Sequence, residues 1–163
     1  MHRWLVGFGW MALASGHAFA ATTDCGLPKI SGSRELQAAL SLRAVELIKR
    51  AANSDDGQAA LVAPTATFSL GAGDVGRSLG TGVAGARELA RTMNADTYRF
   101  LGWDYMDEPA IACSKRKVEV EFIDSQAKTL SRVEFTFDLG RVVNAAGWQR
   151  SFETGLLEDN TAR

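Results

Sequence analysis

KVEVEFID, at residues 117–124, decides the fold, because its apolar and polar side chains alternate. LSRVEFTFD, at residues 130–138, repeats this alternation, and a third segment runs from Arg141 to about Leu157. Alternation at period two indicates strands that bury one face and expose the other. We therefore predict an antiparallel sheet whose inner face is formed by Val118, Val120, Phe122, Val133, Phe135 and Phe137.

The opposite face of these strands carries charges of both signs. We expect Arg132 to pair across strands with Glu119 or Glu121. Leu139-Gly140 predicts a tight turn in which glycine supplies a positive φ. Ala145-Ala146-Gly147 has little side chain to pack and predicts a bulge in the third strand. After this bulge one face is shared by Trp148, Arg150 and Phe152.

The first 20 residues predict an export signal. His2 and Arg3 form a basic start, Trp4–Ala14 is an apolar run, and Ala18-Phe19-Ala20 is a small-x-small cleavage site. The apolar run is about half as long as a membrane span requires. We expect cleavage before Ala21 and a soluble chain, free of the membrane, in the periplasm or outside the cell.

The composition after cleavage argues against several chemistries. The chain has two histidines, His2 and His17, and both leave with the signal. The loss of both imidazoles disfavours Ser-His or Cys-His nucleophile pairs, a histidine base and most zinc sites. The formal net charge of the full chain is −1 at pH 7, which does not favour nucleic acid as a partner. We predict no metal and no cofactor.

Two cysteines, Cys25 and Cys113, remain after cleavage. Export places them in an oxidising compartment, where a pair normally closes. The bridge would tether segment 21–32 to the start of the sheet, with a stabilisation of roughly 4 to 5 kcal/mol in the chain-entropy model. Two buried free thiols are the alternative.

A long helix is predicted between the N-terminal segment and the glycine-rich region. Ser33 is placed to cap it, Glu35 lies in its first turn, and Lys49 and Arg50 lie in its last, which fits the helix dipole. Spacings of three and four residues give it a broad apolar face, which the sheet can cover. That face comprises Leu36, Leu40, Ala44, Leu47, Ile48 and Ala51.

The stretch from Gly71 to Gly85 contains the G-x-G-x-x-G spacing twice. The second copy opens a predicted helix at about Val83–Met93 and precedes Asp104 by about 19 residues, as in dinucleotide sites. A Rossmann turn, however, follows an apolar strand, and Asp74–Leu79 is polar. We therefore predict a short strand at Thr67–Leu70 and a glycine-rich hairpin that leads into the helix, without a nucleotide.

An aromatic-rich strand is predicted from Thr97 to Asp107. One alternate set contains Tyr98 and Phe100 together with Gly102 and Asp104, and the other contains Arg99. The second set buries more apolar area at its centre. We expect its members Leu101, Trp103 and Tyr105 to point inward and Asp104 to point outward.

The order of these elements is typical of an α+β domain. Phe135–Val143, followed by Gly147-Trp148, resembles the last hairpin of the nuclear transport factor 2-like superfamily, and the helix entry at Gly82–Gly85 resembles it too. This superfamily includes ketosteroid-isomerase-like and polyketide-cyclase-like domains of the cystatin-like fold. The resemblance implies one domain at 33–157, in which a curved antiparallel sheet wraps around the long N-terminal helix as a cone. Residues 158–163 are then a frayed tail.

The resemblance also implies a pocket at the wide end of the cone. Enzymes of the superfamily place a base and hydrogen-bond donors there, whereas many members only bind or scaffold. The predicted inward sheet positions hold no carboxylate, which favours non-catalytic binding of a small hydrophobic or amphipathic ligand, or of a partner protein. The predicted lining is Trp103, Tyr105, Phe135, Phe137, Trp148 and Phe152, with Arg150 among them for an anionic or planar group.

Three alternatives stay open at this point. The aromatic residues of the predicted lining can instead be core. If Asp104 points inward, it becomes the general base of a metal-free isomerase or cyclase, with a pKa raised by burial. The charged outer face of the sheet predicts a monomer or a weak, salt-sensitive dimer.

Overall fold

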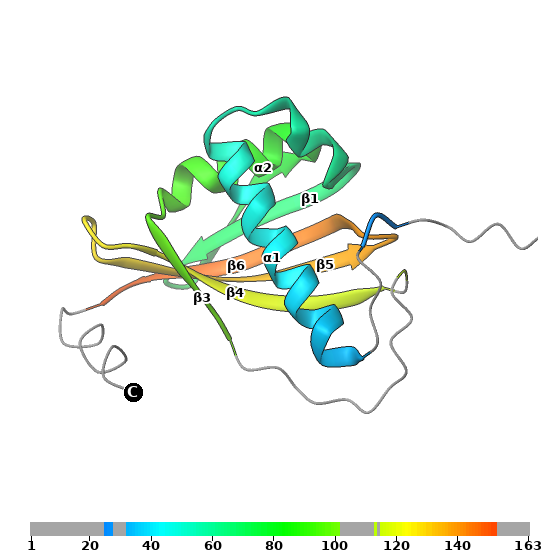
Figure 1. Cartoon of the computed structure of the whole chain (residues 1–163). Coiled ribbons are helices and arrows are strands. Elements are labelled where there is room, and N and C mark those ends of the chain that lie inside the picture. The colour runs from blue at the N-terminus through cyan, green and yellow to red at the C-terminus, as the bar shows by residue number, and fades with distance from the viewer. Residues whose placement is uncertain (1–24, 28–31, 102–112, 114, 153–163) are drawn as a thin grey trace, which may run out of the picture.

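A computed structural model describes residues 25–27, 32–101, 113 and 115–152. The described chain folds into two α-helices, one short 3-10 helix and six strands (Figure 1). In chain order these are α1 (Ser33–Ala52), η1 (Asp56–Ala60), β1 (Val62–Ala72), β2 (Val75–Thr81), α2 (Gly82–Met93), β3 (Thr97–Phe100), β4 (Arg116–Asp124), β5 (Thr129–Asp138) and β6 (Arg141–Ser151).

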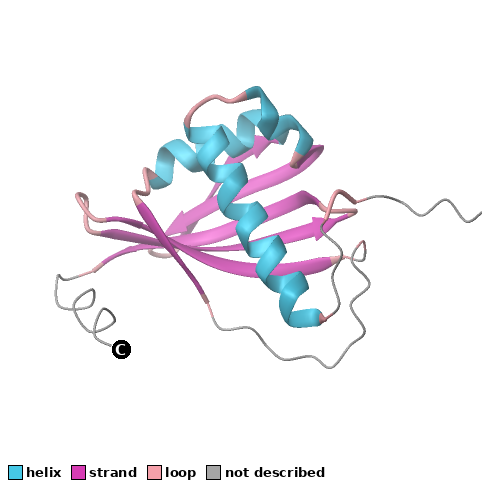
Figure 2. Ribbon diagram, in the orientation of Figure 1, coloured by secondary structure: helices cyan, strands magenta, loops and turns pink. Residues whose placement is uncertain are grey.

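The six strands form one curved sheet in the order β2-β1-β6-β5-β4-β3. Both helices lie against the same face of this sheet, and α1 runs across its strands (Figure 2). The predicted α+β class and the curved sheet around a long first helix are confirmed. One detail differs from the predicted antiparallel sheet, because β1 and β6 pair in parallel in its middle.

Helix α1 follows its predicted amphipathic pattern, and all six residues of the predicted apolar face are buried. The predicted cap was wrong by one residue. The backbone of Gly32 is extended, and its carbonyl accepts the first helical hydrogen bond from Leu36 at 3.1 Å. Ser33 is therefore the first helical residue, and no side chain caps this end.

Strands β4 and β5 present the predicted inner face to the helices, and its six side chains are all buried. On the outer face Arg132 forms an ion pair with Glu119 at 2.5 Å, which confirms one of the two predicted partners. The hydrogen bond that Arg132 donates to Glu119 raises the pKa of Arg132. A second pair across the same strands joins Lys117 and Glu134 at 2.8 Å.

The connection from β5 to β6 is the predicted tight turn. Leu139 and Gly140 both have positive φ, at 47° and 73°. A Cβ at Gly140 would overlap the carbonyl of Cys25, so this position needs glycine for space as well as for conformation.

The predicted bulge at Ala145–Gly147 is wrong, because these residues pair in regular register with β5. The irregularity lies earlier in β6. Phe137 pairs with Val142, whereas its neighbour Thr136 pairs with Asn144, so Val143 is the extra residue.

The glycine-rich stretch forms the predicted hairpin, β1–β2, which leads into α2. Gly73 in its turn has a φ of 57°. Strand β1 is longer than the predicted Thr67–Leu70 and includes Pro64. Its pairing with β6 breaks between Val62 and Thr67, which fits the missing N–H donor of proline.

The side chains of strand β3 point to the opposite faces of the sheet from those predicted. Tyr98 and Phe100 pack against the core. Arg99, from the set predicted to point inward, is exposed and forms an ion pair with Glu121 of the neighbouring strand. Leu101 is half-buried beyond the end of the strand. This ion pair and the packed rings together fix the face.

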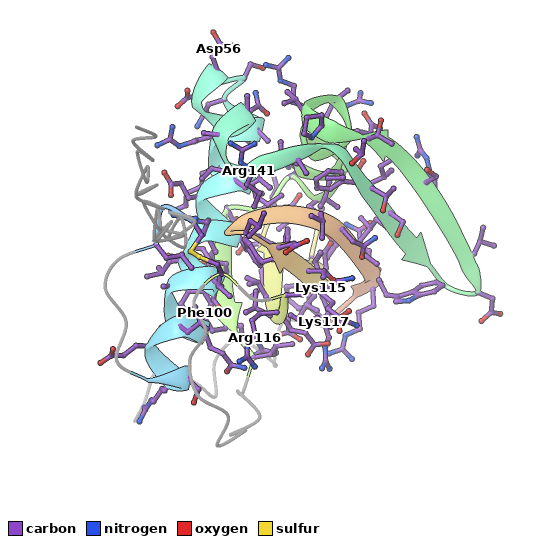
Figure 3. The ribbon with its side chains drawn as sticks, turned by 90° about the vertical axis from the view of Figure 1, so that its right-hand side faces the viewer. Asp56, Phe100, Lys115, Arg116, Lys117 and Arg141 are labelled. Carbon is purple, nitrogen blue, oxygen red and sulfur yellow. A yellow bond between two sulfur atoms is a disulfide. The ribbon has the colours of Figure 1, made fainter. Side chains whose placement is uncertain are left out.

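A disulfide and a set of arginine hydrogen bonds hold the N-terminal segment in place. Cys25 and Cys113 form the predicted disulfide, with their Cα atoms 5.6 Å apart (Figure 3). Arg43 of α1 donates hydrogen bonds to the carbonyls of Cys25 and Gly140, each at 2.9 Å, and to that of Gly26. Burial lowers the pKa of Arg43 from its ordinary value. Sequence reasoning found the disulfide but not this arginine.

Among the helices of the described residues, none is long and apolar enough to cross a membrane.

Candidate functional site

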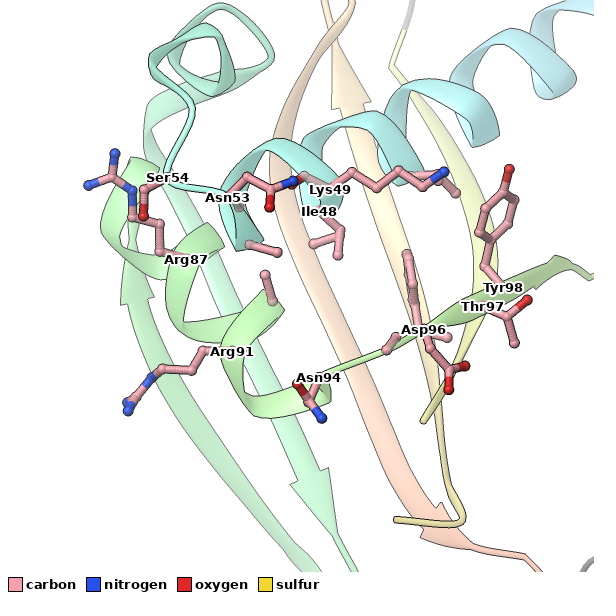
Figure 4. Close-up of a pocket in the computed structure, with 16 residues that line it drawn as sticks. Ile48, Lys49, Asn53, Ser54, Arg87, Arg91, Asn94, Asp96, Thr97 and Tyr98 are labelled. Carbon is pink, nitrogen blue, oxygen red and sulfur yellow. The ribbon is translucent and has the colours of Figure 1, made fainter. Parts of the chain in front are cut away.

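A groove of about 510 Å³ opens between the C-terminal ends of the two helices and strands β3 and β4 (Figure 4). This volume lies within the range of about 300–1,000 Å³ that is usual for small-ligand sites. Its lining comes from α1 and the residues after it, from α2, from the α2–β3 connection and from Thr97, Tyr98 and Phe122 on the sheet.

The floor of the groove is apolar. Val45 and Ile48 project from α1 at helical spacing, and Phe122 projects from the inner face of β4. Small side chains fill the rest, at Ala51, Ala52, Ala90 and Ala95. Because alanine fills little space between the helices and the sheet, these four positions leave the volume open.

The rim of the groove is polar and charged. Lys49 extends along the mouth from α1 toward β3, and its Nζ lies 5.0 Å from the centre of the Tyr98 ring (Figure 4). This is a cation–π contact that joins the two walls. Arg87 and Arg91 of α2 also contribute to the lining, and Arg91 is paired with Glu88 at 2.5 Å.

The connection from α2 to β3 is held against the β4–β5 turn. Asn94 ends α2 in the left-handed conformation, with a φ of 46°, and its amide donates to Asp124 at 2.9 Å. Asp96 accepts from the backbone N–H and the hydroxyl of Ser125, at 3.1 and 3.0 Å. These bonds fix the position of Thr97 and Tyr98 at the mouth.

Asp124 is the last residue of β4, and it lies on the inner face of the strand. Its carboxylate accepts backbone hydrogen bonds from Ala127 at 2.8 Å and Gln126 at 3.0 Å, besides the one from Asn94. The Ala127 bond contributes most to a lowered pKa of Asp124, and the Asn94 bond comes next, while burial opposes both. Asp124 is therefore a structural acceptor that holds the turn.

The predicted aromatic pocket is divided between the two faces of the sheet. Phe135 and Phe137 are fully buried on the inner face. Trp148 and Arg150 are exposed on the outer face, where Trp148 pairs with Arg132 and Arg150 with Leu130. The described members of the predicted lining therefore do not line one cavity, and the prediction that joined them was wrong.

The bulge at Val143 explains this division. Val142 is buried on the inner face, and strict alternation from it would also point Trp148 inward. The extra residue shifts the alternation, so that Ala145 and Gly147 face inward and Trp148 faces outward.

The outer face has its own apolar contacts. The indole of Trp148 lies over Gly71 of β1, where a Cβ would overlap the ring, and 52% of the tryptophan stays exposed. Phe152 forms a small buried cluster with Ile123 and Leu130. Arg150 forms no ion pair within the described residues.

Trp103, Asp104 and Tyr105 lie outside the described residues, as do Ala20 and Ala21 of the predicted cleavage site. Their predicted roles stay predictions. Within the described part of the chain, no group of three His, Cys, Asp or Glu residues is arranged to hold a metal ion.

Sequence reasoning missed the residues that line the groove. Lys49 was assigned to the helix dipole, and Tyr98 was placed on the wrong face. A usable signal was present, because alanines cluster at the ends of both helices, at 51–52 and at 90 and 95. Small residues at both helix ends indicate a place where the core is not filled.

No protein-family model matches the sequence, and no curated protein matches it. Several of the structural neighbours are described as cystatin-like or NTF2-like proteins. A protein of unknown function with a cystatin-like fold from Methylobium petroleophilum aligns with a TM-score of 0.48 and 14% identity, over 82% of this chain and 86% of that one.

An NTF-2 like protein of unknown function from Burkholderia xenovorans aligns with a TM-score of 0.44 and 14% identity, over 73% of this chain and 90% of that one. A de novo designed NTF2 fold protein aligns with a TM-score of 0.40 and 11% identity, over 80% of this chain and 93% of that one. At such low identity the similarity concerns the fold alone.

Proposed function

We propose that this chain is an exported, non-catalytic domain that binds a small amphipathic ligand in the groove between α1, α2 and β3. One observation carries the proposal: an apolar floor and a polar rim occur together in one concavity of small-molecule size. Such a floor takes up the apolar body of a ligand, and the rim fixes the orientation of its polar end.

Hydrogen bonds hold the wall of the groove that is formed by the α2–β3 connection, and a fixed wall favours binding. Asn94 and Asp96 hold the α2–β3 connection on the β4–β5 turn, so the wall that bears Tyr98 is preformed. A preformed site avoids the entropy cost of ordering a loop when the ligand arrives.

Export is supported by the chain's first 20 residues and by the Cys25–Cys113 disulfide. Disulfides of this kind persist in oxidising compartments and are rare in the cytosol. The sample for the binding experiment is therefore the protein from the exported fraction. Its intact mass is expected to correspond to a chain that begins at Ala21 and has lost two hydrogens to the disulfide.

The binding experiment uses anilinonaphthalene sulfonate, an amphipathic fluorescent probe. Ala52 lines the groove and is exposed, so Ala52→Trp should fill the groove without disturbing the core. We expect this variant to lose most of the probe's fluorescence gain. Ala84→Trp is the matched control, because Ala84 is an exposed alanine of α2 that does not line the groove. Equal probe binding by both variants, with unchanged melting temperatures, would contradict the proposal.

A further inference from the structure

The charged side chains around the groove differ in whether they have a partner. Arg91 is paired with Glu88, and Asp96 accepts two hydrogen bonds from Ser125. On α1, Glu46 is paired with Arg50 at 2.6 Å. Lys49 forms no ion pair within the described residues, although it lines the groove.

The helix dipole does not account for this lysine. A cation in the last turn of α1 is favourable, but the neighbouring Arg50 already supplies one there. Lys49 instead crosses the mouth to lie over Tyr98, with which it forms a cation–π contact that is weak at an exposed site. An ammonium that, among the described residues, is held by a ring and by no ion pair is available to a stronger partner.

A carboxylate is such a partner. Hydrogen bonds between ionised groups are about twice as strong as neutral ones, and they add to the attraction of the charges. An anion at this point would meet the ammonium of Lys49 beside the Tyr98 ring. The same groove is lined by Val45, Ile48 and Phe122, which cannot solvate a charge but can bury an apolar chain.

We infer that the groove selects amphipathic carboxylates, with Lys49 as the residue that binds the acid group and the α1–β4 floor as the surface that buries the apolar tail. This inference rests on the proposed function, since it names the ligand class for the same groove. It also explains why the charged part of the rim stands at the edge of the apolar floor rather than within it.

Three probes of equal chain length test the inference: octanoate, the neutral octanamide and the cationic octylammonium. Each is titrated into the disulfide-intact, signal-free chain by calorimetry at low salt. We expect octanoate to bind tightest and octylammonium weakest. Lys49→Gln should weaken octanoate by about tenfold or more, because a hydrogen bond between charged groups is worth roughly 1.5–3 kcal/mol. It should leave octanamide within about twofold.

Arg87→Gln is the matched control. Arg87 lines the same groove from α2 and forms no ion pair within the described residues, so this variant removes one charge at the other end of the mouth (Figure 4). We expect a smaller loss of octanoate affinity that 0.5 M salt abolishes. A larger loss with Arg87→Gln than with Lys49→Gln would overturn the assignment of Lys49.

The two proposals fail in different ways. If octanoate and octanamide bind equally and Ala52→Trp abolishes both, the groove binds ligands but does not select carboxylates, and the inference is wrong. If no probe binds and Ala52→Trp changes nothing, the proposed function itself is wrong.

Discussion

The two faces of the central strands bury aromatic residues in different ways. On the inner face Phe135 lies under the helices with no exposed surface. On the outer face Trp148 lies over a glycine and keeps half of its surface in solvent. The difference shows that aromatic content does not reveal which face of a strand is the core. The face of Trp148 is set by its position after the bulge in β6.

A single extra residue in β6 places Trp148 on the outer face. Val143 shifts the alternation of β6, and everything after it exchanges faces. The same shift lets Gly147 face inward, where a Cβ would overlap the carbonyl of Arg132. Before the bulge Val142 therefore points inward, and after it the aromatic Trp148 points outward.

The largest expected effect contrasts the two aromatic residues directly. Phe135→Ala should lower the free energy of unfolding by about 3–5 kcal/mol, because it leaves a cavity in a fully packed core. Trp148→Ala should lower it by only about 1 kcal/mol, since half of the indole is already in water. Urea unfolding of both variants checks this contrast. Equal losses would show that the outer face contributes as much as the core.

A smaller effect is expected at the glycine beneath the tryptophan. Gly71→Ala places a methyl group where the indole lies and should cost about 1–3 kcal/mol. The same change in a Trp148→Ala background should cost almost nothing, because the clash is gone. Urea unfolding of the four proteins gives the coupling energy. Additive losses would mean that the ring does not depend on this glycine.

A third prediction concerns the carboxylate that ends the inner face. The folded-state pKa of Asp124 is lowered, so its charged form stabilises the fold. That contribution is complete above the ordinary aspartate pKa of about 3.9 and is lost as pH falls through the lowered value. Asp124→Asn should therefore destabilise more at pH 7 than at pH 2.

Asp138→Asn is the control for this third prediction. Asp138 is exposed at the outward-facing end of β5, and the substitution removes the same charge. Thermal unfolding of both variants at the two pH values gives the comparison. A constant penalty for Asp124→Asn across pH would show that its side-chain shape matters and its charge does not.

Much of the fold follows from patterns that are local in sequence. Helix α1, helix α2, the β4–β5 pair and the turn at Leu139-Gly140 were predicted because each depends on periodicity or turn chemistry within a few residues. The side-chain orientations in β3 and at the end of β6 were not predicted. Each is fixed by a partner on another strand, Glu121 in the first case and the register against β5 in the second.

The candidate site was less accessible to sequence reasoning than the fold. A groove is space that side chains leave unfilled, and sequence patterns describe the side chains that are present. Lys49 and Tyr98 meet because α1 crosses the sheet at a particular place, and nothing within either segment encodes that crossing. The alanines at the two helix ends were visible, but their proximity in space was not.

The parallel pairing of β1 with β6 joins two strands that are synthesised at different times. Thr67 meets Asn144 through a side-chain hydrogen bond across 77 residues. At synthesis rates of about 5–20 residues per second, that partner appears roughly 4 to 15 s after β1. During this interval the β1–β2 hairpin can close, but one edge of β1 stays unpaired and open to other chains. The pairing of β1 with β6 therefore forms after the β1–β2 hairpin can close, and one edge of β1 stays open until β6 has been made.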